Sequence, residues 1–168
     1  MLREEIPILG DWFKIHYTLN PGMAFGLEFG SAYGKLGLSS IRIIAMVFIS
    51  YFLYKFIKRK IHPALLISGA LILGGAIGNL IDSIFYGVLL EGNVMPYQEN
   101  AMLYPWFHGQ VIDMFYFDIW SGYLDIPFWG KTYMSFWPIF NVADSAIFIG
   151  VVMLLIFQKH YPSEKKNN

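Results

Sequence analysis

Three long apolar runs constrain this chain more than any other feature of its 168 residues. A helix needs about 20 mostly apolar residues to cross the hydrocarbon core of a bilayer. The three runs are "LSSIRIIAMVFISYFLYKFI", "PALLISGALILGGAIGNLI" and "FNVADSAIFIGVVMLLIF". A chain this short has too little other material to bury three such helices in a soluble core. The sequence therefore predicts an integral membrane protein with spans at about 39–58, 63–83 and 141–158.

Composition agrees with this prediction and excludes several kinds of site. The hydrophobic content is 56%, and the 12 basic side chains balance the 12 acidic ones, so net charge gives no reason to expect a nucleic-acid partner. The absence of cysteine excludes disulfides, thiolate nucleophiles and thiolate metal ligands. The four histidines lack a short ligand spacing, so we expect no metal and no cofactor.

The basic residues predict the orientation of the spans. "KFIKRK" lies between the first two runs and "QKHYPSEKK" follows the third. Cytoplasmic loops carry an excess of Lys and Arg, so both clusters should face the cytoplasm. Segments 1–38 and 84–140 are then extracytoplasmic, and we expect residues 1–168 to form a single integral-membrane domain.

The extracytoplasmic segments have strand character. "DWFKIHYTLNPG" mixes aromatic and β-branched residues and breaks at Asn20-Pro21-Gly22, which predicts a strand followed by a turn. The segment before the third span is rich in Trp, Tyr and Phe, whose rings favour the membrane interface. The predicted fold class is mainly an α-helical transmembrane bundle with a small extracytoplasmic β platform at the membrane surface.

Small residues of the second span predict a close helix contact. Ala70, Gly74 and Gly78 recur every four residues, with Gly75 beside them. This spacing lets a neighbouring helix approach. We expect the face to pack against another helix and to direct Asn79 and Asp82 toward protein rather than lipid.

Polar residues gather at the outer ends of two spans. Asn79 and Asp82 repeat the spacing of Asn141 and Asp144, three residues apart on one helical face. Asn141 and Asp144 also suit an N-cap and the third helical position, so Asp144 is explained equally well by capping and by function. Asp82 lies at the far end of its predicted span, where the helix dipole disfavours a negative charge. Capping therefore does not explain Asp82, and either a structural hydrogen bond or a functional site would.

Further carboxylates lie in the aromatic segment. Asp113 interrupts an apolar run, where a lone charge is costly. Asp118 and Asp125 follow it, and residue pattern alone does not separate solvated from functional members of this group. Ser83 and Ser145 each follow an Asp, but no suitably placed His or Lys supplies a base for a serine nucleophile.

Four blocks, in order, resemble the motifs of bacterial lipoprotein signal peptidase, or signal peptidase II. They are "NPGMAFG", "GGAIGNLID", "VIDM" and "FNVADSAI". The resemblance assigns the two catalytic aspartates of that family to Asp113 and Asp144. The residues that it implies for substrate binding and support are Asn20, Gly22, Asn79, Asp82 and Asn141.

The resemblance implies a membrane aspartic endopeptidase of the bacterial inner membrane, multi-pass, with its active site on the extracytoplasmic side. The implied substrate is a prolipoprotein whose lipobox cysteine carries diacylglycerol, cut just before that cysteine. Membrane lipids are the other expected partner, and we expect a monomer. The helix N-terminus near Asp144 favours that residue as the base.

The chain departs from the family pattern in three places. Members of the family usually have four spans, so we expect one further spanning helix upstream of "MLREEIPILG". Ser83 stands where the family normally has Arg, so a charge-assisted contact is missing or supplied elsewhere. Residues 88–108 resemble an insertion that would extend over the site or contact a partner.

Two other interpretations use the same residues. A small transporter or channel subunit would use Asp82, Asp113 and Asp144 as proton or cation relays. Such relays spread across membrane depth, whereas here the carboxylates collect at one boundary. A non-catalytic assembly protein is the third interpretation.

Overall fold

The computed structural model describes residues 5–21, 34–94, 103–126, 130–135 and 139–160. The chain divides into two compact units. Unit 1 comprises Met1–Asn20 and Ile112–Asn141, and unit 2 comprises Pro21–Val111 and Val142–Asn168. Each unit draws on both halves of the chain, so neither is a continuous segment. One domain over 1–168 stays our prediction.

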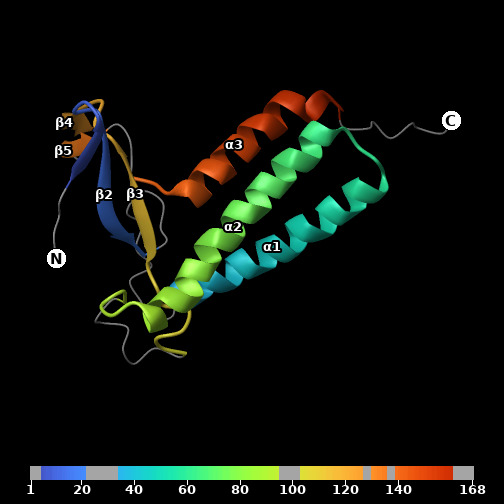
Figure 1. Cartoon of the computed structure of the whole chain (residues 1–168), viewed down its shortest axis with the longest axis horizontal. Coiled ribbons are helices and arrows are strands. Elements are labelled where there is room, and N and C mark those ends of the chain that lie inside the picture. Colours follow the sequence, from blue (N-terminus) through green and yellow to red (C-terminus); the bar gives the residue numbers. More distant parts are fainter. Residues whose placement is uncertain (1–4, 22–33, 95–102, 127–129, 136–138, 161–168) are drawn as a thin grey trace. The chain divides into compact units, whose positions relative to one another are not determined.

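Unit 2 contains the three predicted spans (Figure 1). They are α1 (Gly34–Lys58), α2 (Pro63–Leu89) and α3 (Val142–Phe157), and the short 3-10 helix η2 (Gln158–His160) follows α3. All three are long and apolar enough to cross a membrane. Helix α2 contacts both α1 and α3.

Two helices are longer than predicted. Helix α1 begins at Gly34 instead of 39, and α2 continues to Leu89 instead of ending at 83. The polar residues near 83 do not end α2 because the protein satisfies them internally: the Ser83 hydroxyl donates to the Asn79 carbonyl at 2.9 Å. Asp82 therefore lies inside the helix, and its predicted place at the helix end was wrong.

Close packing of α2 on α3 depends on Gly75 and Gly150. A Cβ atom on Gly75 would lie 2.3 Å from the Ala143 carbonyl oxygen, and one on Gly150 would lie 2.7 Å from the Ser68 carbonyl oxygen. The predicted stripe is partly wrong, because Ala70 and Gly74 are exposed and a Cβ on Gly74 would meet no atom within 4 Å. The helix is rotated so that Gly75 faces α3.

We expect Gly75→Ala to lower the thermal stability of the purified protein in detergent. The added methyl would overlap backbone of α3, and overpacking of this kind costs about 1–3 kcal/mol. Gly74→Ala is the matched control, since open space surrounds that position. Equal melting temperatures for the two variants would contradict this account of the α2 and α3 contact.

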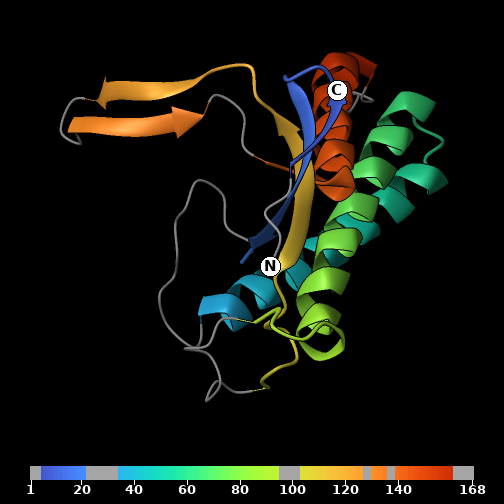
Figure 2. The same cartoon turned by 60° about the vertical axis from the view of Figure 1, so that its left-hand side comes forward.

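Unit 1 contains two small sheets (Figure 2). The strands β1 (Ile6–Leu9), β2 (Phe13–Asn20) and β3 (Val111–Phe117) form one sheet in the order β1-β2-β3, and β1 and β2 run antiparallel. The other sheet is the antiparallel pair β4 (Ser121–Ile126) and β5 (Gly130–Ser135). The predicted strand before Pro21 is confirmed, whereas Gly22 of the predicted turn lies outside the described residues.

Stacked aromatic rings hold β2 and β3 together. The rings of Phe13 and Phe117 lie 4.8 Å apart between centroids, and Phe140 stacks on Phe117 at 5.7 Å. Phe140 also forms an antiparallel bridge with Phe115. Aromatic pairs at such distances stabilise a fold beyond the area that they bury. The cluster fixes the residue that precedes Asn141 beside the strand that carries Asp113.

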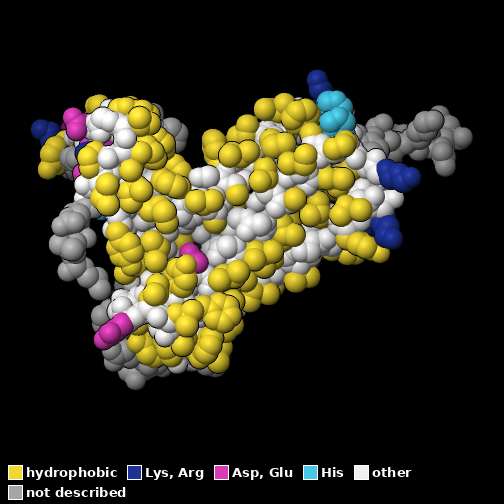
Figure 3. All heavy atoms as spheres, in the orientation of Figure 1, with side chains coloured by type: hydrophobic (Ala, Val, Ile, Leu, Met, Phe, Trp, Pro, Cys, Tyr) yellow, Lys and Arg dark blue, Asp and Glu magenta, His cyan; other side chains and the backbone are white. Residues whose placement is uncertain are grey.

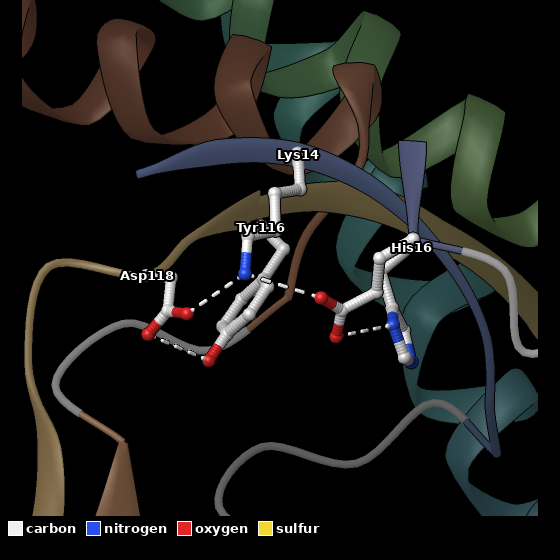
Figure 4. A network of polar contacts seen from close by, with 5 residues as sticks. Lys14, His16, Tyr116 and Asp118 are labelled. Atoms are coloured by element: carbon white, nitrogen blue, oxygen red, sulfur yellow. Dashed lines mark hydrogen bonds and ion pairs between the residues drawn. The ribbon is translucent and has the colours of Figure 1, made fainter. Parts of the chain in front are cut away.

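A polar network covers another part of this sheet (Figure 4). The Lys14 ammonium lies 3.0 Å from an Asp118 carboxylate oxygen and 3.2 Å from one of Glu5. The hydrogen bond to Asp118, and then that to Glu5, raises the pKa of Lys14 above its ordinary value. Tyr116 donates its hydroxyl to the same Asp118 carboxylate at 3.3 Å. Asp118 is therefore part of a structural ion pair.

The surface of the helices is mostly hydrophobic (Figure 3). Large apolar side chains such as Ile41, Val47 and Phe148 are about two-thirds exposed, at 65%, 64% and 66%. Such exposure is costly in water and favourable in lipid. Basic side chains lie where α1 meets α2, at the predicted cytoplasmic cluster.

Candidate active site

Asp113 is held by amide donors on both of its carboxylate oxygens. It occupies the third position of β3 and is 2% exposed. The Asn20 side-chain amide donates to Oδ2, and the Asn141 amide donates to Oδ1, each at 2.8 Å. A buried carboxylate is tolerated only when such donors replace water. Two donors on different oxygens also fix the plane of the carboxylate.

The amides come from segments far apart in sequence. Asn20 is the last residue of β2, while Asn141 directly precedes α3. Asn141 reaches Asp113 because the Met114 and Phe115 amides donate to the Phe140 carbonyl, at 3.1 and 2.8 Å. The resemblance placed Asn20 and Asn141 in the support of the site, and both contact Asp113.

Asp144 has an amide partner of its own in unit 2. It is the third residue of α3, and the Asn79 side chain donates to its Oδ1 at 2.8 Å. The first turn of a helix presents unpaired N–H groups and a partial positive charge, which favour a carboxylate there. Asn141 occupies the position that precedes α3, and a functional role for Asp144 stays a prediction.

The Asn79 and Asp144 side chains should be coupled energetically. We expect a double-mutant cycle of Asn79→Ala and Asp144→Ala, measured by thermal unfolding in detergent, to give an interaction of about 1–3 kcal/mol. Asn79→Ala combined with Gln158→Ala is the control, because Gln158, in η2, bonds locally to the Leu155 carbonyl at the end of α3. Additive effects in the first cycle would argue against the bond.

Sequence reasoning missed two basic residues of α1. Arg42 donates from Nη1 to the Ser83 hydroxyl at 3.1 Å, and the Lys35 ammonium donates to the Pro21 carbonyl at 2.5 Å. Ser39, fully buried, lies between them on the same helical face. The signal was the spacing of 35, 39 and 42, which share one face of a helix. The charge missing at position 83 is thus supplied from the neighbouring helix.

The other predicted residues take separate positions. Asp82 is half-buried and hydrogen-bonds with Tyr86 one turn further along α2. Asp125 is exposed on β4, opposite Lys131 in the register of β5. Gly22 lies outside the described residues. Within the described ranges no three His, Cys, Asp or Glu side chains form a metal-binding group, and the absence of a metal stays a prediction.

The described ends of segment 88–108 lie against α2. The Phe107 amide donates to the Ile84 carbonyl at 3.3 Å, and the Gly109 amide donates to the Ser83 carbonyl at 3.0 Å. A Cβ on Gly87 would lie 2.5 Å from the Pro105 carbonyl oxygen, so the contact requires glycine there. Residues 95–102 lie outside the described part, and a role over the site stays a prediction.

Comparison with known proteins identifies the family. The family model described as "Signal peptidase (SPase) II" matches residues 1–159. The chain belongs to the signal peptidase II family. A lipoprotein signal peptidase of Porphyromonas gingivalis is 46% identical over 167 residues, covering 93% of this chain and 71% of that protein. One of Chlorobium phaeobacteroides is 35% identical over 158 residues, covering 94% and 79%.

The fold comparison agrees with this membership. A solved bacterial membrane enzyme matches all of this chain and 79% of its own, with 23% identity and a TM-score of 0.55. The predicted fold class is therefore confirmed: apolar spanning helices with small antiparallel sheets. As a member of the signal peptidase II family, the chain is an aspartic protease of the bacterial inner membrane. The transporter and assembly interpretations do not fit a peptidase.

Proposed function

We propose that this signal peptidase II removes the signal peptide from diacylglyceryl-modified prolipoproteins by cutting before the lipidated cysteine, with Asp113 and Asp144 as its catalytic pair. The observation that carries the assignment is that each of these carboxylates is held by asparagine amides. Asn20 and Asn141 bind Asp113, and Asn79 binds Asp144. No comparable asparagine partner is found for Asp82, Asp118 or Asp125 in the described residues, where Tyr86 and Lys14 bind the first two.

Chain connectivity supports a joint role for the two aspartates. Asn141, which binds Asp113, precedes Asp144 by three residues. One short stretch of chain therefore serves both carboxylates. Two carboxyl groups that act together cannot both ionise easily, and they share one proton.

The reaction needs one ionised and one protonated carboxyl group. In this proposal Asp144 is the base, because the first turn of α3 stabilises negative charge. Asp144 takes a proton from water as the water oxygen attacks the scissile carbonyl carbon, and Asp113 donates its proton to the carbonyl oxygen. When the C–N bond breaks, the proton on Asp144 passes to the leaving amine of the cysteine, and the diol returns a proton to Asp113.

The apolar helices suit a lipid-anchored substrate. Acyl chains of the modified cysteine stay in the bilayer while the peptide bond reaches the outer half of α2 and the first turn of α3, which carry Asn79 and Asp144. Nothing in this chemistry needs a cofactor or a nucleic acid. We propose that the enzyme acts as a monomer.

We expect Asp113→Asn and Asp144→Asn each to abolish cleavage of a purified lipidated prolipoprotein. Asparagine keeps the shape of aspartate but cannot exchange the proton, so a loss of about 10³-fold or more follows for a residue that transfers protons. Detergent melting curves should show that both variants fold. Asp125→Asn is the control, since Asp125 is exposed on β4. Substantial turnover by either variant would remove that residue from the pair.

We propose that the outer ends of α2 and α3 face away from the cytoplasm and that the basic turn between α1 and α2 faces into it. Cysteines introduced at Lys58 and Glu91, in a chain that has none, report the two sides. A membrane-impermeant thiol reagent added to spheroplasts should label position 91 and spare position 58. The reverse labelling would place the site on the wrong side.

A further inference from the structure

Arg42 contacts α2 at Ser83, one turn after Asn79, whose side chain binds Asp144. Its guanidinium donates to the Ser83 hydroxyl at 3.1 Å, and the Ser83 hydroxyl donates to the backbone carbonyl of Asn79 at 2.9 Å. The Asn79 side-chain amide then donates to Asp144 at 2.8 Å. All three bonds lie within unit 2, where they link α1 to α2 and α2 to α3.

The groups that form these hydrogen bonds are shielded from water. Ser83 is 0% exposed and Asn79 is 8% exposed, so water does not compete freely for either. Arg42 is half-buried, whereas its neighbours Ile41 and Ile43 are exposed, so the guanidinium is turned away from the apolar surface. A charge within a span is expensive unless it is paired inside the protein.

Arg42 also attracts Asp144 electrostatically. The guanidinium keeps its charge in proteins, so at any working pH it attracts a negative charge on Asp144. Coulomb attraction is stronger at the low effective dielectric of a protein interior than in water. Ser83 has no charge of its own, and its hydroxyl instead fixes where the guanidinium lies.

We propose that Arg42 is a positioning residue for the aspartic protease reaction, which fixes the α2 backbone at Asn79 through Ser83 and places a positive charge that favours Asp144 as the base. This inference rests on the proposed function. It explains how the chain works with serine at position 83, because α1 supplies the positive charge that α2 lacks there. Lys35, two turns earlier on the same face of α1, bonds to the Pro21 carbonyl and belongs to a separate contact.

The test compares kcat and KM of full-length variants on a purified lipidated prolipoprotein. Arg42→Gln should lower kcat by about 10-fold or more with little change in KM, because a displaced catalytic group slows chemistry without weakening substrate binding. Arg42→Lys, which keeps the charge, should recover much of the rate. Arg59→Gln is the control, since Arg59 lies in the basic cluster after α1.

The exchange variant Arg42→Ser with Ser83→Arg separates catalysis from folding. It returns the charge to the same contact from the other helix, so it should be more active than Arg42→Ser alone. Wild-type kcat in Arg42→Gln, equal losses in Arg42→Gln and Arg42→Lys, or a folded but unrecovered exchange variant would each overturn the inference. Failure of the wild-type chain to cleave would instead overturn the proposed function, and the inference with it.

Discussion

The high cost of an unpaired charge in an apolar environment governs the polar side chains of this protein. Asp113 is almost fully buried, and both of its oxygens accept asparagine amides. Asp144 has the same kind of partner in Asn79. An amide donor satisfies a carboxylate without neutralising it, in contrast to the Lys14 ammonium beside Asp118. The carboxylates held by asparagines therefore have no cation bonded to them in these contacts, as the proposed proton transfer requires.

The bond between Asn79 and Asp144 requires helices that approach closely. Gly75 and Gly150 let the backbones of α2 and α3 meet where any side chain would overlap. In lipid, helices associate through close packing and interhelical hydrogen bonds, because apolar burial gives little advantage there. The bond between Asn79 and Asp144 joins the same two helices, so the packing of α2 on α3 and the candidate site depend on each other.

Motif resemblance identified the candidate aspartates, but several inferences from local sequence were wrong, each for a physical reason. The pattern places Asp82 at the far end of a span because polar residues are usually excluded from lipid. Ser83 bonds to the carbonyl four residues earlier, so the helix continues. Regular spacing also favoured Gly74 over Gly75, since a four-residue repeat does not tell which side of the helix faces α3. Arg42 was overlooked because its partner Ser83 is 41 residues away.

The sequence by itself determined the spanning helices, the strand before Pro21 and the aspartates of the motif blocks. Hydropathy over about 20 residues and alternation over a few residues are local properties, and they act before any long-range contact forms. The tertiary structure alone decided which asparagine binds which aspartate, which glycine contacts α3 and where the charge beside Ser83 comes from. Those choices depend on how each helix is rotated about its axis and on which segments meet, and packing between residues distant in sequence fixes both.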